Sequence, residues 1–508
     1  MKKWLNNISK RTWMRIVLVS VFFLILGCSL AGEKVAHNDG IGWDGESFLR
    51  NIQRFTELIT THGYNKYSIQ RIMPWGLVNI VFQACRIEPT PHNALIAGGI
   101  LNVAALVLSI FFFFRISSLK KWKSSTEIIA FASLFYSYAL LKIPGYYILL
   151  SDTFGFLWGM MMLYLFLANK RWWLLFVSIL GAVNWPGVAL LGGLALVFLP
   201  REEIHIQSIL KGFDNVVYRC ALFGLAVLPA LFQLGAIVGS ENHHIMMFRA
   251  DDRPYGIPLF SFALGLLFAC VYLYYMIRPF RISISQTWQQ YNNRKLWLGM
   301  VLMGVCYIGG TGILFSFSNG ETGELGSFGL LKCVMVSCTT DPLCFVESFF
   351  SYFGPVVLLV ILLWQQSAKY VVNNGLGYFF IIALAIFFSL RPEARVSIMF
   401  VPLMTLPVME YVDSLELKRW AAPLYAFSAI VLSHVWFPIN VEGMDTALAW
   451  ENSDHYLEFP AQRYFMCTGH WQSHEMYAVW MAITIIVGGI LYIGFRRKWF
   501  VMQNDILG

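Results

Sequence analysis

Charged residues are scarce in this sequence. They make up 13% of the 508 residues, while hydrophobic residues make up 57%. Soluble domains usually carry about 25% charged residues. Because the interior of a bilayer excludes charge, this composition predicts an integral membrane protein. The apolar runs are near 20 residues long and lack the period-2 alternation of barrel strands, so we expect an all-α, polytopic transmembrane fold.

Several motifs are also absent from the sequence. There is no P-loop and no Gly-rich nucleotide fingerprint, and no CxxC pair that would favour a zinc site. The one Asn-x-Ser/Thr sequon is Asn7-Ile8-Ser9, which favours a bacterial inner membrane over a eukaryotic secretory one. The net charge of +8 comes from Lys and Arg at the ends of apolar runs. It therefore reports on topology, and we expect no nucleic-acid partner and no cofactor.

Each long apolar run predicts a membrane-spanning helix. The first, 14–32, is interpreted as a retained helix rather than a signal peptide. The run 173–199 contains Asn184-Trp185-Pro186, and because proline breaks a helix we expect a hairpin of two short helices there. The short stretch 72–86 is predicted to be re-entrant or interfacial. The runs are 14–32, 93–115, 126–142, 151–168, 173–199, 216–240, 257–278, 296–316, 346–364, 376–390, 397–412, 420–436 and 476–495.

The distribution of Lys and Arg predicts the topology. With the hairpin, every basic cluster lies in the cytoplasm, which gives about 14 crossings with both termini inside. Most polar loops then face outward, towards the periplasm or exterior, and we expect the site there. These loops are 33–72, 241–256, 317–345 and 437–475.

The cysteines divide between apolar runs and outward loops. Those in apolar runs are expected to be buried packing residues: Cys28, Cys85, Cys220, Cys270 and Cys306. An oxidising compartment would allow disulfides among those in outward loops: Cys333, Cys338, Cys344 and Cys467.

The first outward loop holds two aspartates, Asp39 and Asp44, each followed by glycine. Charge beside a bilayer is costly and usually functional. The segment 46–59 has apolar residues at helical spacing and predicts an interfacial helix that holds Asp44 at headgroup depth. A carboxylate there suits a general base. The alternative is that the aspartates cap this helix.

Arginines in outward positions are candidate phosphate ligands. Arg391 and Arg395 flank Glu393 in a short turn between apolar runs. Arginine's planar fork matches phosphate well, but Glu393 could instead pair with one arginine in an internal salt bridge. Arg71 precedes a short apolar segment, where it could bind a phosphate or anchor the chain at the interface.

Other polar residues are weaker candidates. Asp152 opens an apolar run and could cap a helix or bind a sugar hydroxyl. His243 and His244, with Asp251 and Asp252, could bind a divalent metal, but a sugar-binding or solvated loop is favoured. The loop 437–475 mixes Trp, His and carboxylates, which suits acceptor binding or an interfacial cover.

These residues resemble motifs of the GT-C membrane glycosyltransferases. The resemblance lies in Trp43-Asp44-Gly45 with Phe48, in Tyr67–Arg71-Ile72-Met73-Pro74, in Ser151-Asp152, and in Lys170-Arg171 before the hairpin at Asn184. It covers roughly the first 190 residues. The C-terminal half is similar only in general layout.

The resemblance implies a function and a role for each candidate. Family members transfer a sugar from a polyprenyl-phosphate-linked donor to an acceptor on the outer face, with inversion. By motif position the base is Asp44, and many members carry an arginine or glutamate where this chain has Asn184. The partners implied are a lipid-linked sugar donor, membrane lipids, and a glycan, glycolipid or glycoprotein acceptor. The substrate-binding candidates are Asp39, Arg71, Asp152, Asn184, Arg391, Glu393 and Arg395.

The expected organisation is a single transmembrane domain, 1–508, with a GT-C-like module at 1–200 and a variable helical module at 201–508.

Two other functions fit parts of the pattern. An O-antigen ligase or polymerase also uses outward arginines and lipid-linked glycans, but concentrates its function in a large late loop. A secondary transporter should show internal repeats and charges at mid-membrane, and neither is evident.

Overall fold

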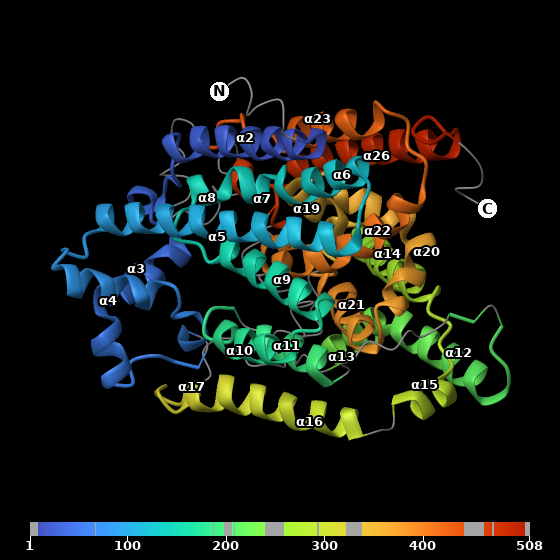
Figure 1. The fold of residues 1–508 in the computed structure, drawn as a ribbon, viewed down its shortest axis with the longest axis horizontal. Helices are drawn as coiled ribbons and strands as arrows, with labels where there is room; N and C mark the ends of the chain where they lie inside the picture. Colours follow the sequence, from blue (N-terminus) through green and yellow to red (C-terminus); the bar gives the residue numbers. More distant parts are fainter. Residues whose placement is uncertain are drawn as a thin grey trace.

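The computed structural model describes residues 9–502, apart from 67, 186, 198–205, 208, 239–258, 292–293, 322–337, 441–461 and 470–471. All regular structure in these residues is helical, joined by isolated bridges such as Glu393 with Thr468. The all-α prediction is therefore confirmed. Figure 1 shows the long helices α2, α5, α26 and α16 running roughly along one axis. The elements are α2 (Lys10–Ala31), η1 (His37–Gly40), α3 (Trp43–Thr60), η2 (Ser68–Arg71), α4 (Trp75–Cys85), α5 (Pro91–Lys120), α6 (Ser124–Phe135), α7 (Tyr138–Leu141), α8 (Ile143–Tyr146), α9 (Asp152–Leu167), α10 (Arg171–Gly181), α11 (Val188–Val197), α12 (Gly212–Ala226), α13 (Leu228–Val238), α14 (Leu259–Ile277), α15 (Ile284–Tyr291), α16 (Arg294–Tyr307), η4 (Ile308–Gly312), α17 (Ile313–Phe315), α19 (Cys344–Phe353), α20 (Val356–Asn373), α21 (Leu376–Phe388), η5 (Ala394–Phe400), α22 (Val401–Ser414), α23 (Ala421–Leu432), α25 (Gln462–Phe465) and α26 (His474–Arg496).

Every predicted apolar run contains helix, but not every run is one helix. Within the described residues, six helices are long and apolar enough to cross a membrane, or eight if two bent pairs each count as one span. The run 346–364 is two helices, α19 and α20, because Gly354 and Pro355 interrupt it. Several others, including α10 and α11, are short. The count of about 14 crossings stays a prediction.

The predicted helical hairpin at 173–199 is present as α10 and α11, which pack against each other. Its turn follows Gly181 and includes Asn184. The carbonyl oxygen of Val183 accepts a hydrogen bond from the Met73 N–H at 3.1 Å. The turn is thereby joined to the segment that links η2 to α4.

Three basic clusters, at 120–123, 418–419 and 496–498, meet at one end of the molecule. The Lys123 N–H donates to Asp413 Oδ1 at 2.8 Å, and the Lys418 N–H donates to the Phe500 carbonyl oxygen at 2.9 Å. In Figure 1 the end of α26 lies on the side opposite α3 and α4. The first outward loop and these three basic clusters thus occupy opposite ends. This agrees with the predicted topology, while the membrane and its sides stay a prediction.

Ion pairs with the buried carboxylate of Glu127 in α6 hold helix α2 against the bundle. Glu127, near the start of α6, is fully buried and forms ion pairs with Arg11 and with Arg15, whose Nε lies 2.5 Å from Glu127 Oε1. The Ser117 hydroxyl donates to the same carboxylate at 2.5 Å. The two arginine side chains keep 37% and 27% of their surface exposed. Removing the Glu127 carboxylate would therefore leave the guanidinium groups of Arg11 and Arg15 unpaired and only partly hydrated.

We expect Glu127→Gln to destabilise the protein by roughly 2 kcal/mol. This is below the range for breaking a fully buried pair, because the arginines are partly hydrated. Thermal unfolding in detergent measures the effect. The matched control is Glu57→Gln, which removes an exposed ion pair with Arg54 and should change stability by less than about 1 kcal/mol. Equal effects of the two substitutions would contradict a fastening role for Glu127.

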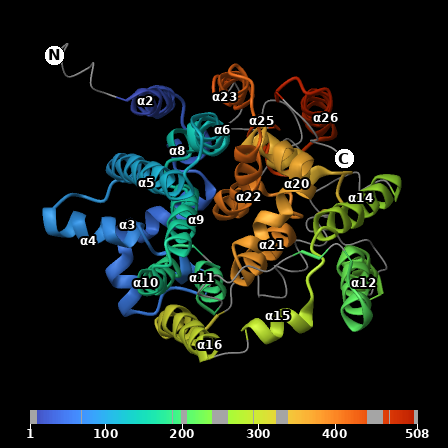
Figure 2. The ribbon, with the colours of Figure 1, turned by 45° about the vertical axis from the view of Figure 1, so that its right-hand side comes forward.

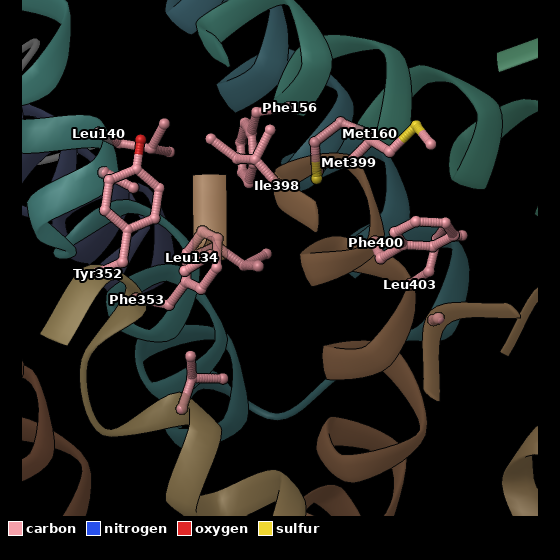
Figure 3. Packing of buried hydrophobic residues seen from close by; sticks show 14 of the residues in the cluster. Leu134, Leu140, Phe156, Met160, Tyr352, Phe353, Ile398, Met399, Phe400 and Leu403 are labelled. Carbon is pink, nitrogen blue, oxygen red and sulfur yellow. The ribbon is translucent and has the colours of Figure 1, made fainter. Parts of the chain in front are cut away.

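Helix α9 lies inside the bundle, surrounded by other helices (Figure 2). It packs against α5, α10, α22 and η5. Figure 3 shows Ile398 and Met399 of η5 beside Phe156 and Met160 of α9. A Cβ at Gly159 would lie 2.3 Å from the Met399 carbonyl oxygen, so only glycine allows η5 to approach this closely. This contact sets the first residue of α9 and the first residues of η5 at fixed positions.

The cysteine predictions need correction. Cys28, Cys85 and Cys220 are exposed rather than buried, because they lie on outer helix faces, which in a membrane protein are also apolar. Cys306 is buried as expected. The described cysteines form no disulfides with one another. Cys467 is a buried thiol, and burial raises its pKa to about 12. Cys333 lies outside the described residues.

Candidate functional site

Asp44 lies inside a helix rather than on a loop before it. Helix α3 begins at Trp43, three residues earlier than predicted, because Gly42 takes φ +71° and ψ 173° and serves as the N-cap. Asp44 is thus in the first helical turn, where the helix dipole favours a carboxylate. Gly42, not Asp44, occupies the cap position, so the capping interpretation of Asp44 is wrong. Along α3, Phe48, Ile52 and Leu58 are buried, as the one-sided apolar pattern predicted.

The carboxylate of Asp44 forms an ion pair with Arg395. Arg395 Nη2 lies 2.6 Å from Asp44 Oδ2, and Arg395 Nε lies 2.9 Å from Glu393 Oε1. Glu393 also pairs with Arg391. The internal salt bridge considered for Glu393 is present, and it involves both arginines. Asp44 and Arg395 keep 41% and 31% of their side-chain surface exposed, so the pair is accessible from outside the protein.

Asp152 belongs to the same group of charges. It is the first residue of α9, is 3% exposed, and accepts a hydrogen bond from the Tyr352 hydroxyl at 3.0 Å. Arg395 interacts electrostatically with Asp152 as well as with Asp44 and Glu393. One guanidinium therefore pairs directly with two carboxylates, Asp44 and Glu393, and feels the charge of a third, Asp152. Such a cation is suited to exchange a carboxylate for another anion.

Aromatic residues surround the Asp44 end of the site. The Tyr147 hydroxyl accepts a hydrogen bond from the Gly45 N–H at 3.2 Å. The Trp43 ring lies 5.0 Å from that of Tyr464 and stacks on His37 at 4.6 Å. Burial raises the pKa of Tyr147 and of Tyr464, so both phenols stay neutral at physiological pH. Neutral phenols and stacked rings are groups that bind sugars without adding charge.

The turn that carries the arginines is held by a segment from late in the chain. The Gly469 N–H donates to the Pro392 carbonyl oxygen at 3.1 Å, and Glu393 forms an antiparallel bridge with Thr468. The Ser397 hydroxyl donates to the Phe388 carbonyl oxygen at 3.4 Å. The end of loop 437–475 therefore packs on the site.

Asp39, Arg71 and Asn184 have different relations to this group. Asp39 is exposed in η1 with φ +49°, and no described residue forms an ion pair or hydrogen bond with its carboxylate. Arg71 is the last residue of η2 and is partly buried. Asn184 is 1% exposed, and its Oδ1 has no hydrogen-bond partner among the described residues.

Asn184 lies in a turn that packs near α9. The next residue, Trp185, is buried, and a Cβ at Gly155 of α9 would lie 3.1 Å from its ring. Gly155 is one turn after Asp152. The residue next to Asn184 therefore contacts the helix that begins at Asp152.

Several predicted residues cannot be placed. The histidines and aspartates of loop 241–256, most of the loops 317–345 and 437–475, and Tyr67 lie outside the described residues. Within the described part of the chain, no group of three or more His, Cys, Asp or Glu side chains could hold a metal ion.

The tyrosines of the site were not identified from the sequence. Tyr352 lies in an apolar run, Tyr147 lies between α8 and α9, and Tyr464 lies in the short helix α25. A buried tyrosine hydroxyl nearly always needs a polar partner. A tyrosine within an apolar run was therefore a usable signal for Tyr352, although Tyr164, Tyr378 and Tyr425 carry the same signal.

Comparisons with known proteins do not assign the chain to a family. No family model, no curated protein and no solved structure matches it.

Proposed function

We propose that this protein is a GT-C-like membrane glycosyltransferase that transfers a sugar from a polyprenyl-phosphate donor to a cell-envelope acceptor. The observation that carries the proposal is the ion pair between Asp44 and Arg395. It joins a carboxylate from the first loop to a guanidinium from a late turn. Base and phosphate ligand are the two groups that this reaction requires. The proposed location is a bacterial inner membrane, with the site facing the periplasm.

The reaction assigns a role to each group. The acceptor hydroxyl oxygen attacks the anomeric carbon from the face opposite the phosphate, and the bond between that carbon and the phosphate oxygen breaks. Asp44 takes the hydroxyl proton. The bond electrons leave with the polyprenyl phosphate, whose added charge is stabilised by Arg395 and Arg391. Because attack and departure occur on opposite faces, the configuration inverts.

The ion pair suggests how the donor primes the site. A guanidinium has five N–H donors in a planar fork, and Arg395 directs Nη2 to Asp44 and Nε to Glu393. A donor phosphate that takes over Nη2 would release the Asp44 carboxylate to accept a proton. Glu393 would keep holding Nε and so fix the plane of the fork. Asp152 and Asn184 are both buried, and we propose that they bind sugar hydroxyls.

We expect Arg395→Gln to raise KM for the donor and lower kcat together, with a loss of about 10²-fold or more in kcat/KM. Arg395→Lys keeps the charge but not the fork and should recover only part of the activity. The assay supplies a panel of polyprenyl-phosphate hexoses and pentoses with a cell-envelope glycolipid extract. Release of polyprenyl phosphate is measured by mass spectrometry.

The control is Arg54→Gln, which removes an exposed arginine of α3 that pairs with Glu57. It should leave both kinetic constants close to wild type. An unchanged donor KM in Arg395→Gln would reject phosphate binding by this residue.

Contact between the late-loop segment 464–469 and the arginine turn also suits an O-antigen ligase. A ligase transfers a whole glycan from a polyprenyl-pyrophosphate carrier. Turnover of pyrophosphate-linked glycans but not of phosphate-linked monosaccharides would favour this second function. Sugar flux into vesicles without transfer would favour a transporter.

A further inference from the structure

An apolar cavity runs along the outer helices of the C-terminal half, from Leu417 and Phe500 at one end to Pro355 and Leu432 at the other. Its volume is about 380 Å³, and its lining residues come from α6, α20, α22, α23 and α26 and from the segments after α22 and α26. Figure 2 shows α20, α22, α23 and α26 near one another. The lining is almost wholly apolar and includes Leu359, Phe427, Val487, Phe495 and Phe500. This size is within the range of ligand sites. An apolar cavity of this kind between outer helices of a membrane protein suits a hydrocarbon chain.

Basic residues lie beside the end of the cavity that Leu417 and Phe495 line. Two of its lining residues, Leu417 and Phe495, are each followed directly by basic residues. The segments 416–420 and 496–502 contain five basic residues, Lys418, Arg419, Arg496, Arg497 and Lys498, against the single acid Glu416. Arg419, Arg497 and Lys498 are exposed, and no described acidic side chain forms an ion pair with them.

The two basic segments are held together by the fold. Leu417 and Val501 form an antiparallel bridge, and the Lys418 N–H donates to the Phe500 carbonyl oxygen at 2.9 Å. Exposed Trp420 and Trp499 flank the cluster, and the Trp420 ring lies 5.8 Å from that of Phe500. Tryptophans at this position are typical of the level of lipid headgroups.

We propose that this cavity binds an anionic phospholipid. One acyl chain would lie between α23 and α26, and the headgroup phosphate would contact Arg497, Lys498 and Arg419. Charge complementarity selects the anionic headgroup, since basic pockets between transmembrane helices bind anionic lipids. The proposed headgroup position at Arg497, Lys498 and Arg419 lies away from Asp44 and Arg395, and the proposal does not depend on sugar transfer.

The test is lipid retention by the full-length protein, measured by native mass spectrometry in a neutral detergent. Phosphatidylglycerol and phosphatidylcholine with identical chains are the probes. We expect wild type to retain phosphatidylglycerol about tenfold better. Arg497→Gln with Lys498→Gln should remove this preference. The matched control, Lys170→Gln with Lys369→Gln, removes two exposed lysines elsewhere and should keep it. Equal loss in both pairs would overturn the proposal.

A second pair of variants tests the cavity itself. Ser428→Phe and Val431→Phe each place a ring in the cavity from α23, and both should reduce retention of the two lipids alike. Either variant, if folded, suffices for the test. Unchanged phosphatidylglycerol retention would show that no chain lies there. Competition with millimolar glycerol phosphate, which has no acyl chain, is the last test. If it abolishes phosphatidylglycerol retention as fully as the phenylalanine substitutions do, the proposal is overturned, because the acyl chain would then contribute nothing to binding.

Discussion

Asp44→Asn should reduce sugar transfer by about 10²- to 10⁴-fold, the usual contribution of general-base catalysis. Asparagine keeps the size of the side chain and can still accept a hydrogen bond from Arg395, but it cannot take a proton from the acceptor hydroxyl. Expression and fold should be unaffected, since the ion pair is partly exposed on both sides and contributes at most about 1 kcal/mol. Release of polyprenyl phosphate and thermal unfolding are measured on the same preparation.

Asp39→Asn is the matched control for this experiment. It changes an exposed aspartate of the same loop, five residues away, with no ion pair to a described residue. We expect at least half of the wild-type rate. Near-normal turnover by Asp44→Asn would reject the base role. A large loss in both variants would instead point to the charge of the whole loop.

Periodicity and composition were sufficient to predict an all-helical fold with several helices able to cross a membrane. Apolar runs and basic clusters gave the helices, the hairpin at Asn184 and the separation of the two ends of the molecule. Break points within runs were harder to predict. One break has a local cause, because Gly354 and Pro355 separate α19 from α20. The bend of 68° between α6 and α7–α8 depends on packing against other helices, which no local pattern contains.

The candidate site was predicted residue by residue but not as an arrangement. Asp44, Glu393 and Arg395 were each chosen for chemical reasons. Their contact depends on how η5 packs against α9, which depends in turn on backbone approach at Gly159. The start of α3 was misplaced because Gly42 takes a positive φ at the N-cap, and the Tyr147 ring from a distant segment lies where a Cβ at Gly42 would be. Long-range contacts of this kind leave no local signal.

Gly42→Ala tests whether that contact positions the proposed base. Gly42 has φ +71° and ψ 173°, a conformation essentially restricted to glycine. A Cβ there would lie 2.3 Å from Cζ of the Tyr147 ring. Backbone strain and the clash together should cost about 3 kcal/mol. They should also displace the first turn of α3 and with it Asp44. Because a shift of about 1 Å can cost 10²-fold in rate, we expect a loss of that order.

One further variant is a control, and a second separates the clash with the Tyr147 ring from the backbone strain at Gly42. Gly27→Ala, in α2, places a methyl where nothing lies within 4 Å and should be neutral in rate and slightly stabilising. Tyr147→Ala combined with Gly42→Ala removes the ring but leaves the unfavourable φ. If the ring sets the position of α3, the double variant should recover part of the rate relative to Gly42→Ala. If the positive φ alone fixes the helix start, the double variant should be no faster, and the two substitutions will show no coupling. In the first case the position of Asp44 depends on a residue about 100 positions later in the chain, and in the second it is encoded by Gly42 itself.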